Sequence, residues 1–345
     1  MTKTYDINIK EFNALISPSK IKEELVLTKD IIDVVTKGRR DIENILQKND
    51  KRFLIIAGPC SIHDTKAACE YAQKIQKIRN RIKDKINLVM RVYFEKPRTT
   101  IGWKGLINDP FLDGSYNINE GLKKARSLLI EISNMKVPIA NEILDPITPQ
   151  YIAGLLSWVA IGARTIESQT HREMASGLSM PIGFKNSTDG SLDTAVNAMI
   201  AARAPQHFLG IDPQGCASVV KTTGNPFGHI VLRGGIRPNY DPVSIDKVQK
   251  LLKEKKLMES IMVDCSHDNS GQKQKGQPFV FKSVIAQRIE GNTNIIGAML
   301  ESNLFEGRQV CENGFQNLEY GVSITDECLS WETTEKLIYY AYENL

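Results

Sequence analysis

The sequence predicts an α/β fold: a single (β/α)8 TIM barrel with an N-terminal extension and an inserted β-hairpin. Short apolar segments rich in β-forming residues alternate with longer segments of helical periodicity, which is typical of a parallel sheet with helices outside. No Gly-x-Gly-x-x-Gly motif follows the first strand, which argues against an open dinucleotide-binding sheet. With 345 residues and 41% hydrophobic content, the chain can bury one large core.

The predicted elements follow one another at regular intervals. Residues 1–50 form a helical extension, in which the segment 28–47 has apolar residues at helical spacing behind Thr28, a residue that can cap a helix. Nine strand candidates follow, at 53–58, 86–94, 137–142, 159–164, 181–185, 206–211, 230–233, 261–265 and 295–301. Helical patterns lie between most of them, at 66–82, 118–134, 149–158, 191–203 and 243–254.

Nine candidates are one more than an eight-stranded barrel needs. The stretch between residues 211 and 230 has no helical pattern, so 206–212 and 216–221 predict a hairpin joined through Pro213, Gln214 and Gly215. Setting aside this insertion, at about 206–222, leaves eight strands. Residues 51–345 are therefore expected to form the barrel domain.

Composition excludes several classes of protein. The net charge of +4 is spread along the chain, and no lysine- or arginine-rich block is interleaved with aromatic residues, so no nucleic-acid partner is indicated. No apolar run approaches the ~18 residues of a membrane span, and the N-terminus lacks the apolar core of a secretory signal. The six cysteines form no Cys-x-x-Cys pair, which is typical of reduced thiols in a cytoplasmic protein.

Cations gather at the carboxyl ends of the predicted strands, which is where a TIM barrel has its active site. Arg91 interrupts the apolar run of the segment VMRVYFEKPRTTIGWKG (89–105) and needs a buried anionic partner. Six cations share this end: Arg91, Lys96, Arg98, Arg164, Lys185 and Arg233. They indicate a site for one or two multiply charged anions, such as phosphorylated carboxylates or sugar phosphates. A solvated basic loop at 96–100 is the alternative.

A second group at the same end contains a thiol, an imidazole and two carboxylates: Cys60, His267, Glu301 and Asp326. Such a set can bind a divalent transition metal. Because the four residues come from distant segments, spacing alone also allows Cys60 to be a packed core thiol and His267 an ordinary polar residue. His171, His207 and His229 flank helices or strands, and we interpret them as structural.

The chain resembles 3-deoxy-D-arabino-heptulosonate-7-phosphate (DAHP) synthase, in its type I, long-chain, feedback-regulated form. The resemblance runs in unbroken order from about residue 5 to the C-terminus, through GPCSIHD, RVYFEKPRTTIGWKG, IGARTIESQTHRE, GFKNSTDGS, IVLRGG, DCSHDNS, ESNLFEG and YGVSITDECLSWE. It implies condensation of phosphoenolpyruvate with D-erythrose 4-phosphate and water to give DAHP and phosphate, the first step of the shikimate pathway. An enzyme like Kdo-8-phosphate synthase, which uses arabinose 5-phosphate, is the alternative, although the loop at 96–99 argues against it.

The resemblance also assigns roles to individual residues. Phosphoenolpyruvate would be held by Arg91, Lys96, Ala163, Arg164, Lys185 and Arg233, and erythrose 4-phosphate by Arg98 and Thr99 with Lys96 nearby. Cys60, His267, Glu301 and Asp326 would bind one divalent ion, Mn, Fe, Co or Zn. Lys96, Glu142 and His267 would be catalytic, with Lys96 donating a proton and Glu142 orienting water. A Schiff-base aldolase using Lys185 and a non-catalytic anion-binding barrel remain as alternatives.

Feedback inhibition by an aromatic amino acid is implied as well, with tyrosine favoured. Residues 1–50 and the hairpin would form the inhibitor pocket at a subunit contact of a homodimer or homotetramer, and Ser179, Phe208 and Gly210 align with its wall. Phenylalanine-sensitive members tend to have serine at the position of Gly210, and glycine there leaves room for the tyrosine hydroxyl. The alternative is that Gly210 serves only the hairpin geometry.

Overall fold

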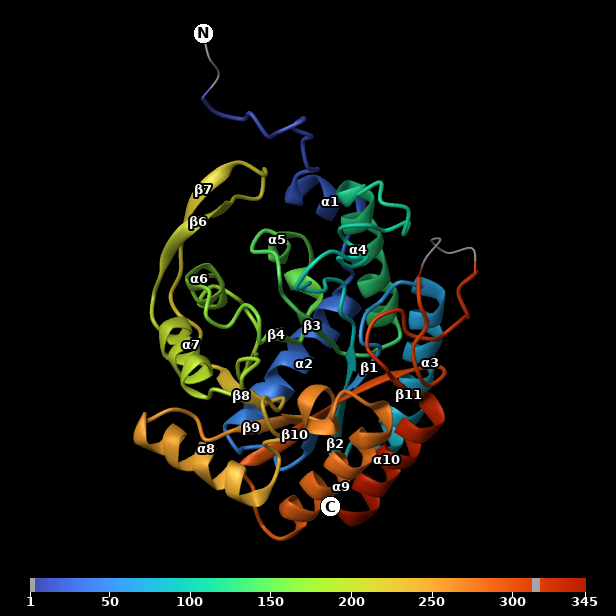
Figure 1. Ribbon diagram of the computed structural model, residues 1–345, viewed down its shortest axis with the longest axis vertical. Coiled ribbons are helices and arrows are strands. Elements are labelled where there is room, and N and C mark those ends of the chain that lie inside the picture. The colour runs from blue at the N-terminus through green and yellow to red at the C-terminus, as the bar shows by residue number, and fades with distance from the viewer. Residues whose placement is uncertain (1–3, 312–316) are drawn as a thin grey trace.

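The computed structural model describes residues 4–311 and 317–345 (Figure 1). The first three residues of the expected 1–50 extension, and residues 312–316 of the expected barrel domain, lie outside the described residues. Within the described ranges, no helix combines the length and the apolar character that crossing a membrane requires.

Eight parallel strands form a closed barrel, which confirms the predicted fold. In order around the barrel they are β1 (Phe53–Gly58), β2 (Ile86–Arg91), β3 (Ile139–Glu142), β4 (Trp158–Ile161), β5 (Ile182–Lys185), β8 (Gly228–Leu232), β9 (Ile261–Asp264) and β10 (Ile295–Asn303). Pairing of β1 with β10, in which Ile56 lies opposite Met299, closes the sheet on itself. A two-residue strand, β11 (Leu329–Ser330), pairs with the end of β10.

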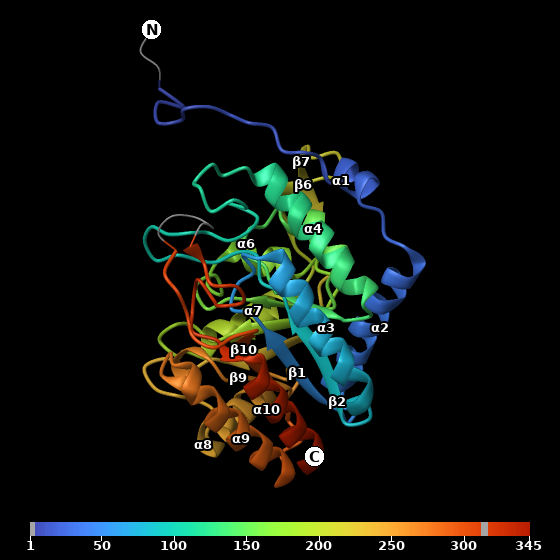
Figure 2. The same cartoon turned by 90° about the vertical axis from the view of Figure 1, so that its right-hand side faces the viewer.

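Helices follow the strands and surround the barrel (Figure 2). They are α3 (Thr65–Ile82), α4 (Ile118–Asn134), α5 (Pro149–Ile152) with the 3-10 turn η1 (Ala153–Leu155), α6 (Gln169–Ala175), α7 (Asp193–Arg203), α8 (Pro242–Glu254), α9 (Gln277–Ile289) and α10 (Trp331–Asn344). Two further 3-10 turns, η2 (His267–Ser270) and η3 (Gln274–Gly276), lie in the loop after β9. Side-chain caps fix several starts: Asp64 accepts hydrogen bonds from the backbone at the start of α3, and Asp241 does the same for α8.

Several boundaries differ from the sequence prediction by one to three residues, among them the end of β4 at Ile161 rather than 164, and two differences have clear local reasons. The helix expected at 149–158 is only one α-helical turn followed by η1, because Gly154 disfavours helix and the chain must extend by Trp158 to enter β4. The strand expected at 86–94 ends at Arg91, after which the Tyr93 carbonyl accepts a hydrogen bond from the backbone N–H of Ile62 in the loop after β1.

The N-terminal end of the barrel is closed by α2 (Lys29–Leu46), which begins after the Thr28 cap as predicted. Its Ile42, Ile45 and Leu46 belong to one apolar cluster with inward-facing strand residues such as Leu54 and Met262. The Ser260 hydroxyl, at the entry to β9, donates to the Leu46 carbonyl over 2.8 Å. This end of the barrel is therefore a continuous apolar core.

The inserted hairpin consists of β6 (His207–Ile211) and β7 (Ala217–Lys221), which pair antiparallel as predicted. It projects from the barrel toward α1 (Pro18–Glu24) (Figure 1), and the backbone N–H of Ser19 donates to the Pro213 carbonyl over 2.8 Å. Residues 4–17 contain no helix or strand; Ile16 is held against the barrel by Asn119 and Tyr151, and residues 4–13 extend beyond it as an arm (Figure 2). Tyr5, Ile7 and Phe12 on this arm are all exposed.

Candidate active site

A cavity of about 390 Å³ lies at the carboxyl ends of the barrel strands. Its wall contains all six cations expected from the sequence, together with Glu142, Ala163, His267 and Asp326. The six cations are Arg91, Lys96, Arg98, Arg164, Lys185 and Arg233. Thr99, in the same loop as Arg98, is exposed and is not part of this wall. The structure therefore brings the predicted anion-binding residues, Thr99 excepted, to one mouth.

Arg91 has the buried anionic partner that its position in an apolar strand requires. Its Nη2 lies 2.7 Å from Oε1 of Glu301 at the end of β10 and 3.1 Å from the Cys60 carbonyl. The guanidinium stacks 3.5 Å above the ring of Tyr93. Burial alone would lower the pKa of Arg91, but the anionic groups around it, with Glu301 first, together outweigh burial and raise the pKa. Arg91 thus stays charged and holds Glu301 in place.

Three of the four expected metal ligands form a compact group. One donor atom each of Cys60, Glu301 and Asp326 lies within 4.8 Å of the other two. A thiolate with two carboxylates matches the ligand preferences of divalent transition metals. The Ser266 hydroxyl donates to the second oxygen of Glu301 over 2.8 Å, so this carboxylate is oriented from both sides.

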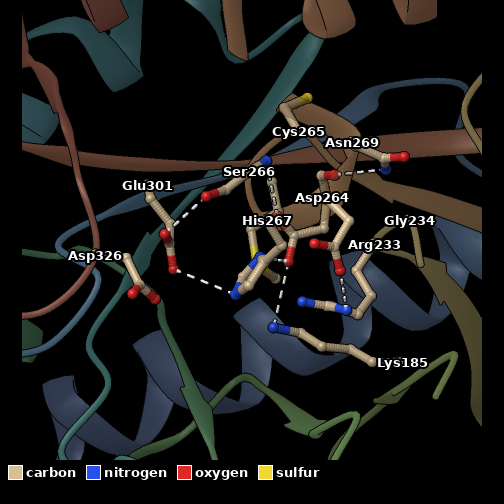
Figure 3. Close-up of polar contacts among 12 residues, drawn as sticks. Lys185, Arg233, Gly234, Asp264, Cys265, Ser266, His267, Asn269, Glu301 and Asp326 are labelled. Carbon is tan, nitrogen blue, oxygen red and sulfur yellow. Dashed lines mark hydrogen bonds and ion pairs between the residues drawn. The ribbon is translucent and has the colours of Figure 1, made fainter. Parts of the chain in front are cut away.

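His267 lies beside this group rather than inside it. Its Nε2 is 3.8 Å from Oε1 of Glu301, and its Nδ1 is 3.0 Å from Oδ2 of the buried Asp264 (Figure 3). The backbone of His267 has φ of 55°, a left-handed conformation that is uncommon outside glycine and is often found where function fixes a side chain. Asp264 thus engages one ring nitrogen and leaves the other facing the metal group.

Lys96 connects the cations with the candidate metal centre. Its Nζ is 3.1 Å from the Cys60 sulfur. Burial, and then the charge of Glu301, raise the pKa of Cys60 to about 12 in the metal-free protein. The protonated thiol donates toward Oδ2 of Asp326, 3.3 Å away. A bound metal ion would replace this proton, because thiol ligands bind as thiolates.

Lys185 occupies the floor of the cavity between two carboxylates. Its Nζ lies 3.3 Å from Oε2 of Glu142. It also lies 3.3 Å from Oδ2 of Asp264 (Figure 3). Burial alone would raise the pKa of Asp264, but His267 and Lys185 lower it well below its usual range. A Cβ at Gly162 would come within 2.5 Å of Oε1 of Glu142, so glycine leaves room for that carboxylate. The floor is therefore a charge-balanced set in which each group fixes its neighbours.

The rim cations differ in their partners. Arg233 pairs with Asp268 at 2.6 Å, and Lys273, which the sequence reasoning missed, pairs with Glu327 at 2.9 Å. Arg98 donates its Nε to the Trp103 carbonyl over 2.8 Å. Among the described residues, neither Arg98 nor Arg164 has a carboxylate within ion-pair distance. The guanidiniums of Arg98 and Arg164 could therefore pair with ligand phosphates.

Sequence reasoning also missed Asp264, Asp268 and Arg308, all of which lie at this mouth or contact its residues. The segment DCSHDNS placed both aspartates beside His267, so a search for partners of the predicted histidine would have found them. Arg308 carried no comparable signal, because it lies in an irregular segment after β10 that meets Ser323 through an isolated bridge.

The three residues expected to form an effector pocket lie around the hairpin base. Phe208 is half-buried and packs against the main core, while Ser179 is exposed in the segment after α6. The Ser176 and Thr222 hydroxyls, 2.6 Å apart, connect that segment with the hairpin. Gly210 lies opposite Ser218, and a Cβ there would come within 2.8 Å of the Val220 side chain. A side chain at position 210 would therefore have to displace Val220.

Comparisons with known proteins agree over almost the whole chain. A family model described as the DAHP synthetase I family matches residues 24–338. The Tyr-sensitive phospho-2-dehydro-3-deoxyheptonate aldolase of Escherichia coli (strain K12) is 50% identical over 340 residues, covering 99% of this chain and 96% of the relative. The Phe-sensitive protein of the same strain is 49% identical over 333 residues, covering 96% and 95%. The solved phospho-2-dehydro-3-deoxyheptonate aldolase from Francisella tularensis SCHU S4 superposes with a TM-score of 0.95 at 46% identity, covering 98% of each chain.

Proposed function

The chain belongs to the DAHP synthetase I family and is a 3-deoxy-7-phosphoheptulonate synthase, and we propose how the residues of its barrel mouth divide the reaction among themselves. The enzyme condenses phosphoenolpyruvate with D-erythrose 4-phosphate and water and releases DAHP and phosphate, the first step of the shikimate pathway. The observation that carries the assignment of residues is one cavity in which six cations face a group of Cys60, Glu301 and Asp326.

Phosphoenolpyruvate is assigned to the side of the cavity formed by β2, β4, β5 and β8. Its binding residues are Arg91, Lys96, Ala163, Arg164, Lys185 and Arg233. Arg164, which lacks a carboxylate partner among the described residues, is available for the phosphate. Lys185 is buried between two carboxylates and remains charged, which suits it to an anionic substrate placed above it.

Erythrose 4-phosphate is assigned to the loop after β2. Arg98 and Thr99 lie in this loop and would bind its phosphate, with Lys96 reaching back toward Cys60. The two substrates are both multiply charged anions, so cations on each side offset their repulsion and hold the reacting carbons together.

A divalent metal ion, Mn, Fe, Co or Zn, is assigned to Cys60, His267, Glu301 and Asp326. When bound, it supplies Lewis-acid activation of the aldehyde of erythrose 4-phosphate. The donor set supports this assignment, because three ligand atoms already lie within 4.8 Å of one another. Asp264 holds the Nδ1 side of His267, so its Nε2 is the nitrogen that remains for the ion.

In the reaction, C3 of phosphoenolpyruvate attacks the aldehyde carbon, water adds at C2, and phosphate leaves from the resulting hemiketal. Lys96 is the assigned proton donor to the alkoxide, because its ammonium lies 3.1 Å from the Cys60 sulfur, between the two substrate regions. Glu142 is assigned to orient the attacking water. Burial alone would raise the pKa of Glu142, but Lys185, Lys96 and Arg91 together lower it, so this carboxylate is ionised and accepts hydrogen bonds.

Regulation is assigned to the parts of the chain that the barrel does not need. An aromatic amino acid, with tyrosine favoured, would bind near Ser179, Phe208 and Gly210, and residues 1–50 with the hairpin would form a subunit contact in a homodimer or homotetramer. The exposed apolar side chains of the arm at residues 4–13 support that contact. We place the enzyme in the cytoplasm, where thiols such as Cys60 and Cys328, which are free in the structure, stay reduced.

A phosphate-release assay with the full chain and both substrates tests this proposal. Activity should require both substrates, disappear with a chelator and return with Mn²⁺. Activity that persists after complete metal removal, with a borohydride-trapped adduct at Lys185, would favour the Schiff-base alternative. A preference for arabinose 5-phosphate over erythrose 4-phosphate would favour the Kdo-8-phosphate synthase alternative. Repeating the assay with each aromatic amino acid tests the effector, and inhibition by phenylalanine or tryptophan but not tyrosine would refute its assignment.

A further inference from the structure

Glu95 is a buried carboxylate in the loop after β2, and the reaction described above does not use it. Three donors from the loop after β3 surround it: its Oε1 lies 3.3 Å from the backbone N of Asp145 and 3.3 Å from Oγ1 of Thr148, and its Oε2 lies 3.5 Å from the backbone N of Leu144. Within the described ranges, no lysine, arginine or histidine forms an ion pair with it.

A carboxylate in this environment is a poor choice for stability alone. Desolvation, and then the nearby charge of Asp145, raise the pKa of Glu95 to about 8. Burying an acid without a cation destabilises the fold, and a glutamine of the same shape could still accept from two of the three donors. A strongly perturbed acid one residue from the substrate-binding Lys96 is therefore a candidate for a functional role.

Glu95 lies at the base of the loop that carries Arg98. The chain is extended here, so successive side chains point to opposite sides: Lys96 reaches the Cys60 sulfur while Glu95 reaches the loop after β3. The Lys96 N–H donates to the Lys104 carbonyl over 2.9 Å, which joins the two ends of the loop. The Glu95 carboxylate thus fixes the whole 95–105 loop to its neighbour along the barrel rim.

The contact continues to the next loop through Leu144. Its N–H faces Glu95, and its carbonyl accepts a hydrogen bond from Nε2 of His171 over 2.6 Å. Nδ1 of His171 lies 2.8 Å from the hydroxyl of Ser168, which ends the loop containing Arg164. His171 was expected to be only structural, but it connects the loop after β3 with the loop after β4. One hydrogen-bonded series therefore spans three consecutive loops of the barrel mouth.

We propose that Glu95 is a positioning residue for the second substrate, and that Leu144 and His171 extend its constraint to the loop that carries Arg164. The series sets the spacing between Arg98 and Arg164, and hence between the two phosphorylated substrates. Misplacing one substrate by a small distance weakens catalysis because the reacting carbons must meet in a narrow range of geometry. The inference rests on the proposed function, since it takes Arg98 and Arg164 as residues of the two substrate sites.

Steady-state phosphate release by three variants tests the inference. Glu95→Ala should raise the KM for erythrose 4-phosphate by about tenfold or more, the scale of losing its three hydrogen bonds, and lower kcat, while the KM for phosphoenolpyruvate changes less than about twofold. Glu95→Gln should have a smaller effect in the same direction, because its oxygen can still accept from Asp145 and Thr148 while its amide group faces the Leu144 N–H. His171→Ala should also raise the KM for erythrose 4-phosphate. Glu332→Gln, on the exposed face of α10, is the matched control and should change neither KM.

The double variant Glu95→Gln/His171→Ala decides whether the two residues act through the same peptide. A shared constraint predicts a combined effect smaller than the product of the single effects. The proposal would be overturned if the Glu95 variants raised the KM values of both substrates equally, or if they lowered Tm without changing the kinetics. If the effect of the double variant equals the product of the two single effects, His171 acts independently and is not part of the constraint. Glu95→Gln keeps the shape of the side chain, so it decides the matter even if Glu95→Ala fails to fold. Wild-type protein that releases no phosphate would instead refute the proposed function.

Discussion

The two ends of this barrel are made from the same eight strands but are filled with opposite kinds of side chain. At the N-terminal end, Ile42 and Ile45 of α2 seal an apolar core. At the C-terminal end the fully buried groups include the ion pair of Arg91 with Glu301 and that of Lys185 with Asp264. Apolar burial stabilises the fold, whereas the attraction in buried ion pairs roughly offsets their desolvation. The apolar end therefore stabilises the fold, whereas the charged end supplies chemistry with little net gain in stability.

The largest expected effect belongs to the charged end. Asp326→Ala removes one donor of the group with Cys60 and Glu301, so bound metal should be lost and activity should fall by more than about a thousandfold, since Lewis-acid stabilisation is worth several kcal/mol. Elemental analysis after dialysis and the thermal midpoint give the two readings. Glu327→Ala is the control, because this neighbouring carboxylate pairs with Lys273 at the rim and should leave the metal in place. An Asp326→Ala protein with full metal content would contradict the assignment.

The apolar end should respond in the opposite way. Ile45→Ala leaves a cavity beneath the strands and is expected to lower the free energy of unfolding by about 2–5 kcal/mol, while kcat/KM of the folded enzyme stays near the wild-type value. Urea unfolding followed by activity measurement separates the two quantities. Ile32→Ala, at a half-exposed position of the same helix, should have little effect on either. A loss of kcat/KM in folded Ile45→Ala protein would show that the two ends are coupled.

The apolar end should be destabilised by acid, and the charged end by alkali. At the apolar end, Nε1 of Trp158 donates to Nε2 of the buried His229 over 2.9 Å, and burial lowers the pKa of His229 from 6.5 to about 4. Burial of neutral His229 therefore contributes up to about 3 kcal/mol to the free energy of unfolding. This contribution is present above pH 6.5 and is lost as the pH falls through about 4. Glu95, at the charged end, has a raised pKa, so the pH dependence is reversed. Its contribution to the free energy of unfolding is present below pH 4.5 and is lost as the pH rises through about 8.

Unfolding free energies measured from pH 4 to pH 9 test this contrast. His229→Gln should flatten the acid side of the profile, Glu95→Gln should flatten the alkaline side, and His207→Gln, on the exposed hairpin, should change neither. A His229→Gln variant with the wild-type acid profile would mean that other groups, not this buried histidine, set the acid limit.

Two substitutions with smaller expected effects should distinguish the two substrate sides of the charged end. Arg98→Ala should weaken the use of erythrose 4-phosphate, and Arg164→Ala the use of phosphoenolpyruvate, each by roughly ten- to a hundredfold, the range for a hydrogen bond to a charged group. Steady-state kinetics with each substrate varied in turn gives the comparison. The reverse pattern, or equal losses for both substrates in both variants, would show that the cavity is not divided as proposed.

The sequence was sufficient for features that depend on local pattern. Alternating periodicity predicted the barrel, and the stretch after Ile211 without helical pattern predicted the hairpin, whose strands fall within one or two residues of the expected bounds. Arg91 could be identified because an arginine in an apolar run requires a buried anion. Features that depend on contacts between distant segments could not be predicted this way. The pairing of Asp264 with His267 and Lys185 is one such feature.

The series from Glu95 through Leu144 to His171 shows the limit most clearly. Each residue is unremarkable in its own segment, and only the closed barrel brings the three loops side by side. Arg98 and Arg164 were predictable as cations at strand ends. The hydrogen bonds that connect their loops were not, because they use backbone N–H and carbonyl groups, whose partners cannot be identified from residue type.

The pairing of β1 with β10 sets a condition on the order in which this protein can be made. The first strand of the barrel ends at Gly58, whereas its partner begins at Ile295, and Cys60 and Asp326 are 266 residues apart in the chain. Contacts of such long sequence separation form slowly and only after the intervening chain is available. On the ribosome, the open edge of β1 therefore stays unpaired until the chain has been made through β10, and until then it is exposed to wrong strand partners. For this chain, the barrel and the group of Cys60, Glu301 and Asp326 are complete only after the residues from Ile295 to Asp326 have been added.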